Sequence, residues 1–408
     1  APRELDAVLA LSGPGVLLAD ETFHGVACSL DYSQRHLVHS LEQLLEAPED
    51  ARQFTGMGAQ AEEPVVALFT SGTTGLPKAA LLPARQLFFN AVHTQTVFEL
   101  TRSDSTLVYT PLFHTGGLNV LAMPLFHCGG TVHIHREFKP QRVLEAILES
   151  GISTIFGVPT TFEMIASQAD LPRLARAGVH LCLCGGAPLP LSLIHRYRDA
   201  GLLLTQGFGM TEVGPNCFYL PSQDALERAG SVGRPMPYAE AEIRVNGRAA
   251  LPDEVGQLWL RGPHVFLGYL GNPEATAESF DGDGWFGTGD LARRDADGFF
   301  HVAGRQKEMF ISGGENVYPA EVEVALANIP GVKEACVVPV PDPRWGEVGF
   351  AFVVTRFGEE DPESVRTQLR ELLAPYKIPK KVRFVAELPR NSSGKVVKKT
   401  LQEEAIHV

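Results

Sequence analysis

The chain has 408 residues and a formal net charge of −13, with 44% hydrophobic and 20% charged residues. This composition excludes an intrinsically disordered chain, and the length predicts two or three domains. The acidic balance argues against a nucleic-acid-binding protein, and no apolar run reaches membrane-spanning length. Six irregularly spaced cysteines and a start without a signal-peptide pattern predict a cytoplasmic location.

The first half of the chain alternates short apolar segments with segments of helical periodicity. Residues 141–150, for example, place Val143 and Ile147 on one helical face. Such alternation predicts largely parallel sheets covered by helices. The strands are expected at residues 64–69, 106–113, 130–135, 153–159 and 181–186.

From about residue 232 the pattern changes to strands separated by Gly- and Asp-rich turns, which predicts antiparallel sheet. These strands are expected at residues 241–247, 256–262 and 298–305. After Gly304 the order helix, two strands, helix and strand predicts a small α+β domain of about 100 residues. Its elements are expected at residues 320–331, 332–342, 349–355, 363–375 and 380–389. We therefore predict an α/β protein with a large N-terminal domain of helix-flanked sheets plus a β-rich subdomain (residues 1–304) and a small C-terminal domain (residues 305–408).

The stretch "LFTSGTTGLPK", residues 68–78, joins an apolar strand to a loop of Ser, Thr and Gly that ends at Lys78. Backbone amides and hydroxyls in such a loop form an anion-binding concavity, which predicts a phosphate site. It is not a Walker A loop, because Gly72 and Gly75 are too close and Ala79 follows the lysine. A plain Gly/Ser turn is the alternative. Residues 377–399 hold eight basic residues and one acidic residue, which fits either a polyanionic partner or a solvated tail.

Five stretches, in the same order along the chain, resemble signatures of the adenylate-forming superfamily, which contains acyl-CoA synthetases, luciferases and the adenylation domains of peptide synthetases. They are "TSGTTGLPK" (70–78), "QGFGMTE" (206–212), "GWFGTGDL" (284–291), "GRQKEMFISGGENVYPAEVE" (304–323) and "PRNSSGK" (389–395). The resemblance implies that a carboxylate attacks the α-phosphate of ATP to give an acyl-adenylate, and that a thiol then displaces AMP. It also implies ATP, Mg²⁺ and CoA as cofactor and co-substrates.

The resemblance assigns parts of the nucleotide to separate motifs. Residues 70–78 would hold the β- and γ-phosphates, and Thr211 and Glu212 would contact the α-phosphate and hold Mg²⁺. Asp290 and Arg305 would bind the ribose, although an aspartate here is also a common turn residue. The full set implied for the nucleotide is Thr70, Ser71, Gly72, Thr73, Thr74, Gly75, Lys78, Gly185, Gly186, Ala187, Pro188, Gly207, Phe208, Gly209, Met210, Asp290 and Arg305.

The catalytic residues that the resemblance implies are Lys395, Thr211, Glu212 and His114. Lys395 follows the turn "NSSG" and would bridge the reacting carboxylate and the α-phosphate. Because it belongs to residues 305–408, that domain would act as a mobile lid, closing for adenylation and rotating for thioester formation. His114 would gate the acyl pocket, with a buried structural histidine as the alternative. The lid's further implied residues are Lys307 at the hinge, Gly313 and Gly314 at the pantetheine tunnel, and Trp345 at the CoA nucleotide.

The acid is predicted from local likeness and from charge. Residues 191–197, 215–223 and 222–235 resemble bacterial fatty-acid–CoA ligases, and the stretches around the expected pocket carry no charged residue. An apolar pocket selects by shape and length, so we predict a medium- or long-chain fatty acid. The alternatives are an aryl or succinylbenzoate-like acid, an enzyme that loads a carrier protein, and a nucleotide-binding protein without catalysis.

The chain departs from the family pattern at three places. Ala79 stands where glycine is common, and Gly287 stands where a bulkier residue is usual. The chain also begins inside the family's N-terminal domain, so we expect that domain to lack its first segment. A metal site at His127, Cys128, His133 and His135 is a weak alternative to an ordinary strand. A homodimer is expected, and peripheral membrane contact is left open.

Overall fold

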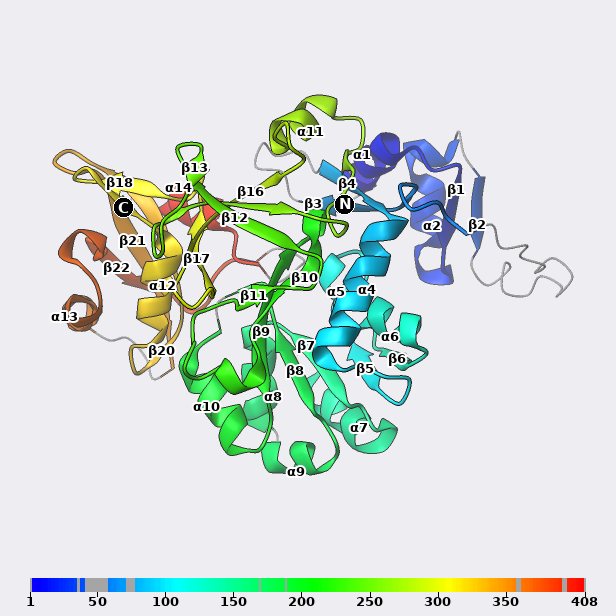
Figure 1. Cartoon of the computed structure of the whole chain (residues 1–408), viewed down its shortest axis with the longest axis horizontal. Helices are drawn as coiled ribbons and strands as arrows, with labels where there is room; N and C mark the ends of the chain where they lie inside the picture. Colours follow the sequence, from blue (N-terminus) through cyan, green and yellow to red (C-terminus); the bar gives the residue numbers. More distant parts are fainter. Residues whose placement is uncertain are drawn as a thin grey trace, which may run out of the picture.

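The computed structural model describes residues 2–34, 37–40, 58–70, 78–168, 170–187, 189–356, 361–390 and 395–406. Figure 1 shows a small lobe, coloured yellow to red, at one end and the N-terminal helices α1 and α2 at the other. We call residues 2–305 the large lobe and residues 310–406 the small lobe. None of the helices described is long and apolar enough to cross a membrane.

The centre of the large lobe is a seven-stranded sheet of order β11-β10-β9-β8-β7-β5-β6. Strands β5 to β9 pair in parallel, and only β10 and β11 run antiparallel to their neighbours. Helices such as α7 cover the sheet and bury Val143 and Ile147, which confirms the predicted helical face. The strands are β5 (Ser105–Val108), β6 (Thr131–Ile134), β7 (Thr154–Gly157), β8 (Leu181–Cys184), β9 (Leu204–Met210), β10 (Gly214–Tyr219) and β11 (Arg234–Pro235). The helices of this part are α4 (Ala84–Phe98), α5 (Thr115–Asn119), α6 (Ala122–Cys128), α7 (Pro140–Ser150), α8 (Pro159–Gln168), α9 (Leu171–Arg176) and α10 (Leu191–Asp199).

Two expected strands of the first half differ from the prediction. The segment expected at 64–69 is β3 (Pro64–Thr70), which pairs antiparallel with β4 (Lys78–Pro83) in a separate sheet, because seven intervening residues are too few for a parallel crossover. Strand β15 (Gly268–Tyr269) completes that sheet beside β4. The strand expected at 106–113 ends at Val108, before the Pro111 turn that leads to His114.

The antiparallel part predicted for the middle of the chain is a five-stranded sheet of order β13-β12-β14-β16-β17. Gly287 lies opposite Trp259 in this sheet, and a Cβ at Gly287 would be only 3.1 Å from the indole ring. The small residue at position 287, where a bulkier one is usual, therefore leaves room for the indole ring of Trp259 on the neighbouring strand. The elements are β12 (Glu240–Val245), β13 (Arg248–Ala249), β14 (Gly256–Arg261), α11 (Pro273–Ser279), β16 (Phe286–Arg294) and β17 (Phe300–Arg305).

The small lobe has its own sheet, of order β19-β18-β21-β20, with β22 parallel to β21. Two hydrophobic clusters lie on its two faces, one under α12 and α13 and the other under α14. The elements are β18 (Phe310–Ser312), β19 (Glu315–Val317), α12 (Pro319–Ala327), β20 (Val332–Asp342), β21 (Gly346–Thr355), α13 (Pro362–Leu372), β22 (Lys381–Phe384) and α14 (Lys398–Ile406). The predicted order of helices and strands is confirmed.

The chain begins with a small αβ segment at the far end of the large lobe (Figure 1). Its two strands pair in parallel and form a sheet of their own. The elements are α1 (Pro2–Ser12), β1 (Val16–Ala19), α2 (Glu21–Ser29) and β2 (Leu37–Ser40).

Candidate functional site

Asp290 and Arg305 are paired across neighbouring strands of the antiparallel sheet. They are register partners on β16 and β17, and Arg305 Nε lies 2.8 Å from Asp290 Oδ1. The second carboxylate oxygen of Asp290 is buried and accepts no hydrogen bond within the described residues. Burial raises the pKa of Asp290 from 3.8 to about 6, although Arg305 pulls it down. An oriented, unsatisfied acceptor of this kind suits a hydroxyl-bearing ligand such as ribose.

Thr211 and Glu212 lie in a short 3-10 turn, Thr211–Val213, directly after β9. The side-chain amide of Gln86, which is buried on α4, donates to the Thr211 carbonyl at 3.0 Å. The backbone N–H of Phe266 donates to the Glu212 carbonyl at 2.7 Å. The backbone is therefore held from both sides. The donor set here is a hydroxyl beside a carboxylate, and hard oxygen ligands of this type fit Mg²⁺.

The lysine at the end of the predicted phosphate loop lies close to this turn. Lys78 begins β4, and its ammonium nitrogen lies 4.7 Å from the centre of the Tyr269 ring. The hydroxyl of Tyr269 in turn donates to Glu212 Oε1 at 3.0 Å. Burial, followed by the nearby Glu212, raises the pKa of Tyr269, so the phenol keeps its proton. The structure thus joins Lys78 and Glu212 through one tyrosine.

Lys395 reaches the large lobe from the small lobe and lies among the predicted site residues. Desolvation by the surrounding protein, followed by the charge of Arg305, lowers the pKa of Lys395, although the residue is partly open to solvent; Glu212 and Asp290 oppose that effect. Burial and then Lys395 lower the pKa of His114, which keeps that imidazole neutral near pH 7. One site therefore brings together residues that lie as far apart in the chain as His114 and Lys395.

His114 itself stands at the start of α5, and its ring lies 4.6 Å from the ring of Phe113. Its Nε2 is buried and has no hydrogen-bond partner within the described residues. A neutral imidazole with a free buried nitrogen can contact a ligand. Both ring nitrogens of the buried His93 and His264 also have no hydrogen-bond partner within the described residues, so this feature does not separate the gating role of His114 from that of a structural histidine.

Gly185 to Ala187 and Gly207 to Met210, which the resemblance implies for the nucleotide, lie on two neighbouring segments. A Cβ at Gly185 would lie 4.0 Å from the carbonyl oxygen of Gly207, so the loop after β8 lies beside β9. Gly186 has a φ of +81°, a conformation that favours glycine, and Gly209 packs so closely on Pro215 that a Cβ would clash at 2.2 Å. The structure places the remaining candidates Ala187, Phe208 and Met210 on the same two segments.

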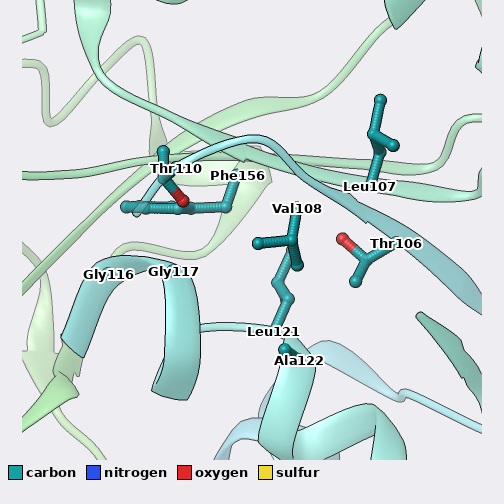
Figure 2. Close-up of a pocket in the computed structure, with 9 residues that line it drawn as sticks. All are labelled: Thr106, Leu107, Val108, Thr110, Gly116, Gly117, Leu121, Ala122 and Phe156. Carbon is teal, nitrogen blue, oxygen red and sulfur yellow. The ribbon is translucent and has the colours of Figure 1, made fainter. Parts of the chain in front are cut away.

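A small cavity opens between β5 and the start of α5 (Figure 2). Phe156 of β7 lies between two glycines, because a Cβ at Gly116 would be 3.3 Å from its ring and a Cβ at Gly185 would be 3.4 Å away. None of the residues lining this cavity is charged. They are Thr106, Leu107, Val108, Thr110, Gly116, Gly117, Leu121, Ala122 and Phe156.

The residues implied for CoA form a second group on the small lobe. Gly313 has a φ of +61°, and a Cβ there would be 2.5 Å from Trp345. The N–H of Gly313 also donates to the Trp345 carbonyl at 2.9 Å. Gly314 follows in the same turn. Lys307, the residue implied for the hinge, is exposed in the turn between β17 and β18, just outside the small lobe. Figure 1 places β18 well away from β9 and β10, so this group is separate from the site around Lys395.

Some predicted residues lie outside the described part of the chain. They are Ser71, Gly72, Thr73, Thr74, Gly75 and Pro188, together with the turn at residues 391–394. The weak metal alternative gains no support, because the described residues contain no group of three or more metal-ligating side chains. Sequence reasoning missed Gln86, Phe156 and Tyr269. Each is an ordinary helix or strand residue in the sequence, and only its contact with a distant motif marks it.

Comparison with known proteins identifies relatives along nearly the whole chain. A family model described as AMP-binding enzyme matches residues 1–270, and one described as AMP-binding enzyme C-terminal domain matches residues 321–395. A feruloyl-CoA synthase of Amycolatopsis sp. is 40% identical over 397 residues, which are 97% of this chain and 80% of that protein. A 2-succinylbenzoate–CoA ligase of Geobacillus kaustophilus is 35% identical over 98% of this chain and 80% of its own length.

Solved structures show the same fold. ATP-bound MatB from Rhodopseudomonas palustris superposes with a TM-score of 0.90 at 30% identity, over 99% of this chain and 82% of that one. The o-succinylbenzoate CoA synthetase MenE from Bacillus subtilis, in complex with ATP and magnesium ion, gives a TM-score of 0.87 at 31% identity, over 98% and 82%.

Proposed function

Because this chain belongs to the AMP-binding enzyme family and is an ATP-dependent acid–CoA ligase, we propose that it activates an aromatic carboxylic acid. The observation that carries the proposal is the position of Phe156, whose ring lies between Gly116 and Gly185 at the edge of an uncharged cavity. The two glycines approach opposite edges of the ring, at Cε1 and Cε2. An aromatic ring face is a surface on which a planar acyl group stacks better than a puckered or branched one.

The names of relatives support the same acid class. The feruloyl-CoA synthase of Amycolatopsis sp. and the 2-succinylbenzoate–CoA ligase of Geobacillus kaustophilus are named for acids that contain a benzene ring. A fatty acid is the second candidate, because the sequence stretches expected around the acyl pocket carry no charged residue.

In the proposed reaction the chain's residues position groups and balance charge. Asp290 accepts hydrogen bonds from the ribose, which fixes the nucleotide relative to Glu212. Lys395 stabilises the negative charge that develops between the attacking carboxylate and the α-phosphate, where preorganised electrostatics contributes most to rate. Neutral His114 contacts the acid without attracting its charge. Mg²⁺ held at Thr211 and Glu212 would offset phosphate charge. Small-lobe rotation would then bring Gly313 and Trp345 to CoA.

The acid class is tested by ligation of free CoA with matched acids. We expect 3-phenylpropanoate and cinnamate to give a kcat/KM at least about tenfold above 3-cyclohexylpropanoate, which has the same length and a puckered ring. Gly116→Val places its side chain against the edge of the Phe156 ring, so it should displace the ring and reduce this preference, while KM for ATP stays unchanged. Preference for octanoate or longer chains would support the fatty-acid candidate instead, and transfer to a carrier protein without transfer to CoA would exclude both.

A further inference from the structure

Tyr269 lies between Lys78 and Glu212, two residues implied for binding the phosphates and Mg²⁺. Its ring lies 4.7 Å from the ammonium nitrogen of Lys78, and its hydroxyl lies 3.0 Å from Oε1 of Glu212. In the chain it follows Glu212 by 57 residues. A single side chain therefore contacts both the lysine that ends the predicted phosphate loop and the carboxylate predicted to hold Mg²⁺.

The backbone of Tyr269 is fixed by two neighbouring elements, β4 and α11. It is paired with Ala80 in the β15–β4 register, and its N–H donates to the Thr276 hydroxyl at 2.9 Å. The preceding Gly268 has a φ of +141°, and a Cβ there would be 2.4 Å from the Thr276 methyl. The close approach of α11 to β15 thus depends on a glycine. This packing fixes the position of the Tyr269 ring, and a residue that positions another group must itself be held in place.

The Tyr269 hydroxyl differs from the hydroxyls of two buried tyrosines in the kind of group that accepts its hydrogen bond. Tyr109 and Tyr197 donate to backbone carbonyls, at 2.7 Å from Phe156 O and 2.9 Å from Phe162 O. Tyr269 donates to a carboxylate at the site. A donor on Oε1 fixes the rotation of the Glu212 carboxylate, so that the direction of the second oxygen is set before any ligand arrives.

We propose that Tyr269 is a positioning residue that orients Glu212 toward a divalent cation and, through its ring, holds the Lys78 ammonium beside the same phosphates. The inference rests on the proposed function, because it concerns the nucleotide site of that reaction. The hydroxyl contact with Glu212 and the ring contact with Lys78 should each have its own effect on the site. Loss of the hydroxyl disturbs the carboxylate, and loss of the ring also disturbs the ammonium.

The test separates the two effects with Tyr269→Phe and Tyr269→Leu. Mn²⁺ serves as the probe, and its binding to the full chain with ATP is measured by electron paramagnetic resonance. We expect Tyr269→Phe to weaken Mn²⁺ binding about tenfold and to lower kcat, while KM for ATP changes less than twofold. Tyr269→Leu should weaken Mn²⁺ binding equally and also raise KM for ATP about fivefold, since Lys78 loses its support.

The matched control is Tyr197→Phe, which removes a tyrosine hydroxyl bonded to a carbonyl far from the site. It should leave Mn²⁺ binding unchanged. Unchanged Mn²⁺ affinity in Tyr269→Phe, or a Tyr269→Phe chain that no longer folds, would overturn the proposal in favour of a purely structural tyrosine. The proposed function fails separately: a wild-type chain that ligates no acid would refute it, yet a Mn²⁺ defect confined to Tyr269 variants would still support the positioning role.

Discussion

The two lobes hold their contributions to the site in different ways. On the large lobe, Asp290 and Arg305 are register partners within one sheet, and the Thr211–Glu212 turn is fixed by bonds from Gln86. On the small lobe, Lys395 lies three residues before Lys398, which is paired with Glu308 at 2.7 Å and with Glu323 at 3.0 Å. The pair with Glu323 holds Lys398 within the small lobe, and the pair with Glu308 holds it to the turn that joins the lobes.

This difference fits a rigid large-lobe site that the small lobe completes. The large-lobe groups are oriented by sheet register and buried hydrogen bonds, which cost much to break. Lys395 comes to them from the other lobe, and the ion pair of Arg356 with Glu163 at 3.3 Å joins the two lobes. We therefore expect substitutions on the large lobe to alter nucleotide binding, and substitutions on the small lobe to alter single half-reactions.

Lys395→Ala is expected to show the largest difference between the two half-reactions, adenylate formation and thioester formation. Removing the ammonium should lower the rate of adenylate formation by about 10²- to 10³-fold, because a preorganised positive charge is lost from the transition state. Conversion of a supplied acyl-adenylate to acyl-CoA should fall less than threefold. The measurements are pyrophosphate release for the first step and thioester formation for the second. Equal loss in both steps would contradict the division of work between the lobes.

Much of this comparison could be predicted from the sequence. The order of strands and helices follows from apolar periodicity, and Asp290, Arg305 and Lys395 stand in motifs whose likeness to a family is strong. The errors have local causes. The strand expected to reach residue 113 stops at Val108 before the Pro111 turn, and β3 joins a hairpin sheet because β4 follows too soon.

The missed residues could not be predicted, because their roles depend on contacts between distant segments. Tyr269 has no local signal, since its partner Glu212 belongs to another part of the chain. Phe156 is an unremarkable strand residue until Gly116 and Gly185 are seen on its two sides. Periodicity predicts which face of an element is buried, but it does not say which element covers that face.

A second prediction concerns the rigid lobe and its buried carboxylate. Asp290→Asn should lower kcat/KM for ATP roughly 10- to 100-fold, because the ionised acceptor of the ribose hydroxyls is lost. In the wild-type protein the same loss should occur as the pH falls through about 6, where Asp290 becomes protonated. The asparagine variant should lack that part of the pH profile. A profile shared by both proteins would assign the ionisation to another group.

The same carboxylate should make the wild-type protein less stable at neutral pH. Its pKa is raised from 3.8 to about 6 by folding, so the folded state binds the proton more tightly and stability falls as the pH rises through that interval. Asp290→Asn should therefore raise the free energy of unfolding by on the order of 2 kcal/mol at pH 7.5, and by much less near pH 4. Thermal unfolding without nucleotide measures the difference, and a gain that is equal at both pH values would contradict the assignment to Asp290.

The smallest effect is expected at the ion pair that joins the lobes. Arg356 and Glu163 have side chains 42% and 31% exposed, so their attraction is worth less than about 1 kcal/mol. Arg356→Gln should slow adenylate formation two- to fivefold in low salt, because the closed arrangement loses one contact, and the deficit should shrink in high salt as ions screen the wild-type pair. Thioester formation from supplied adenylate should be unchanged.

The matched control is Arg383→Gln. Arg383 pairs with Glu404 at 2.8 Å, entirely within the small lobe, and its side chain is 43% exposed. The substitution Arg383→Gln removes an equally exposed arginine but leaves the contact between the lobes intact, so both half-reactions should keep their wild-type rates. If the two variants behaved alike, the slower adenylation would reflect altered net charge. If only Arg356→Gln slowed adenylation, the contact with Glu163 would be the element that holds Lys395 against the large-lobe site.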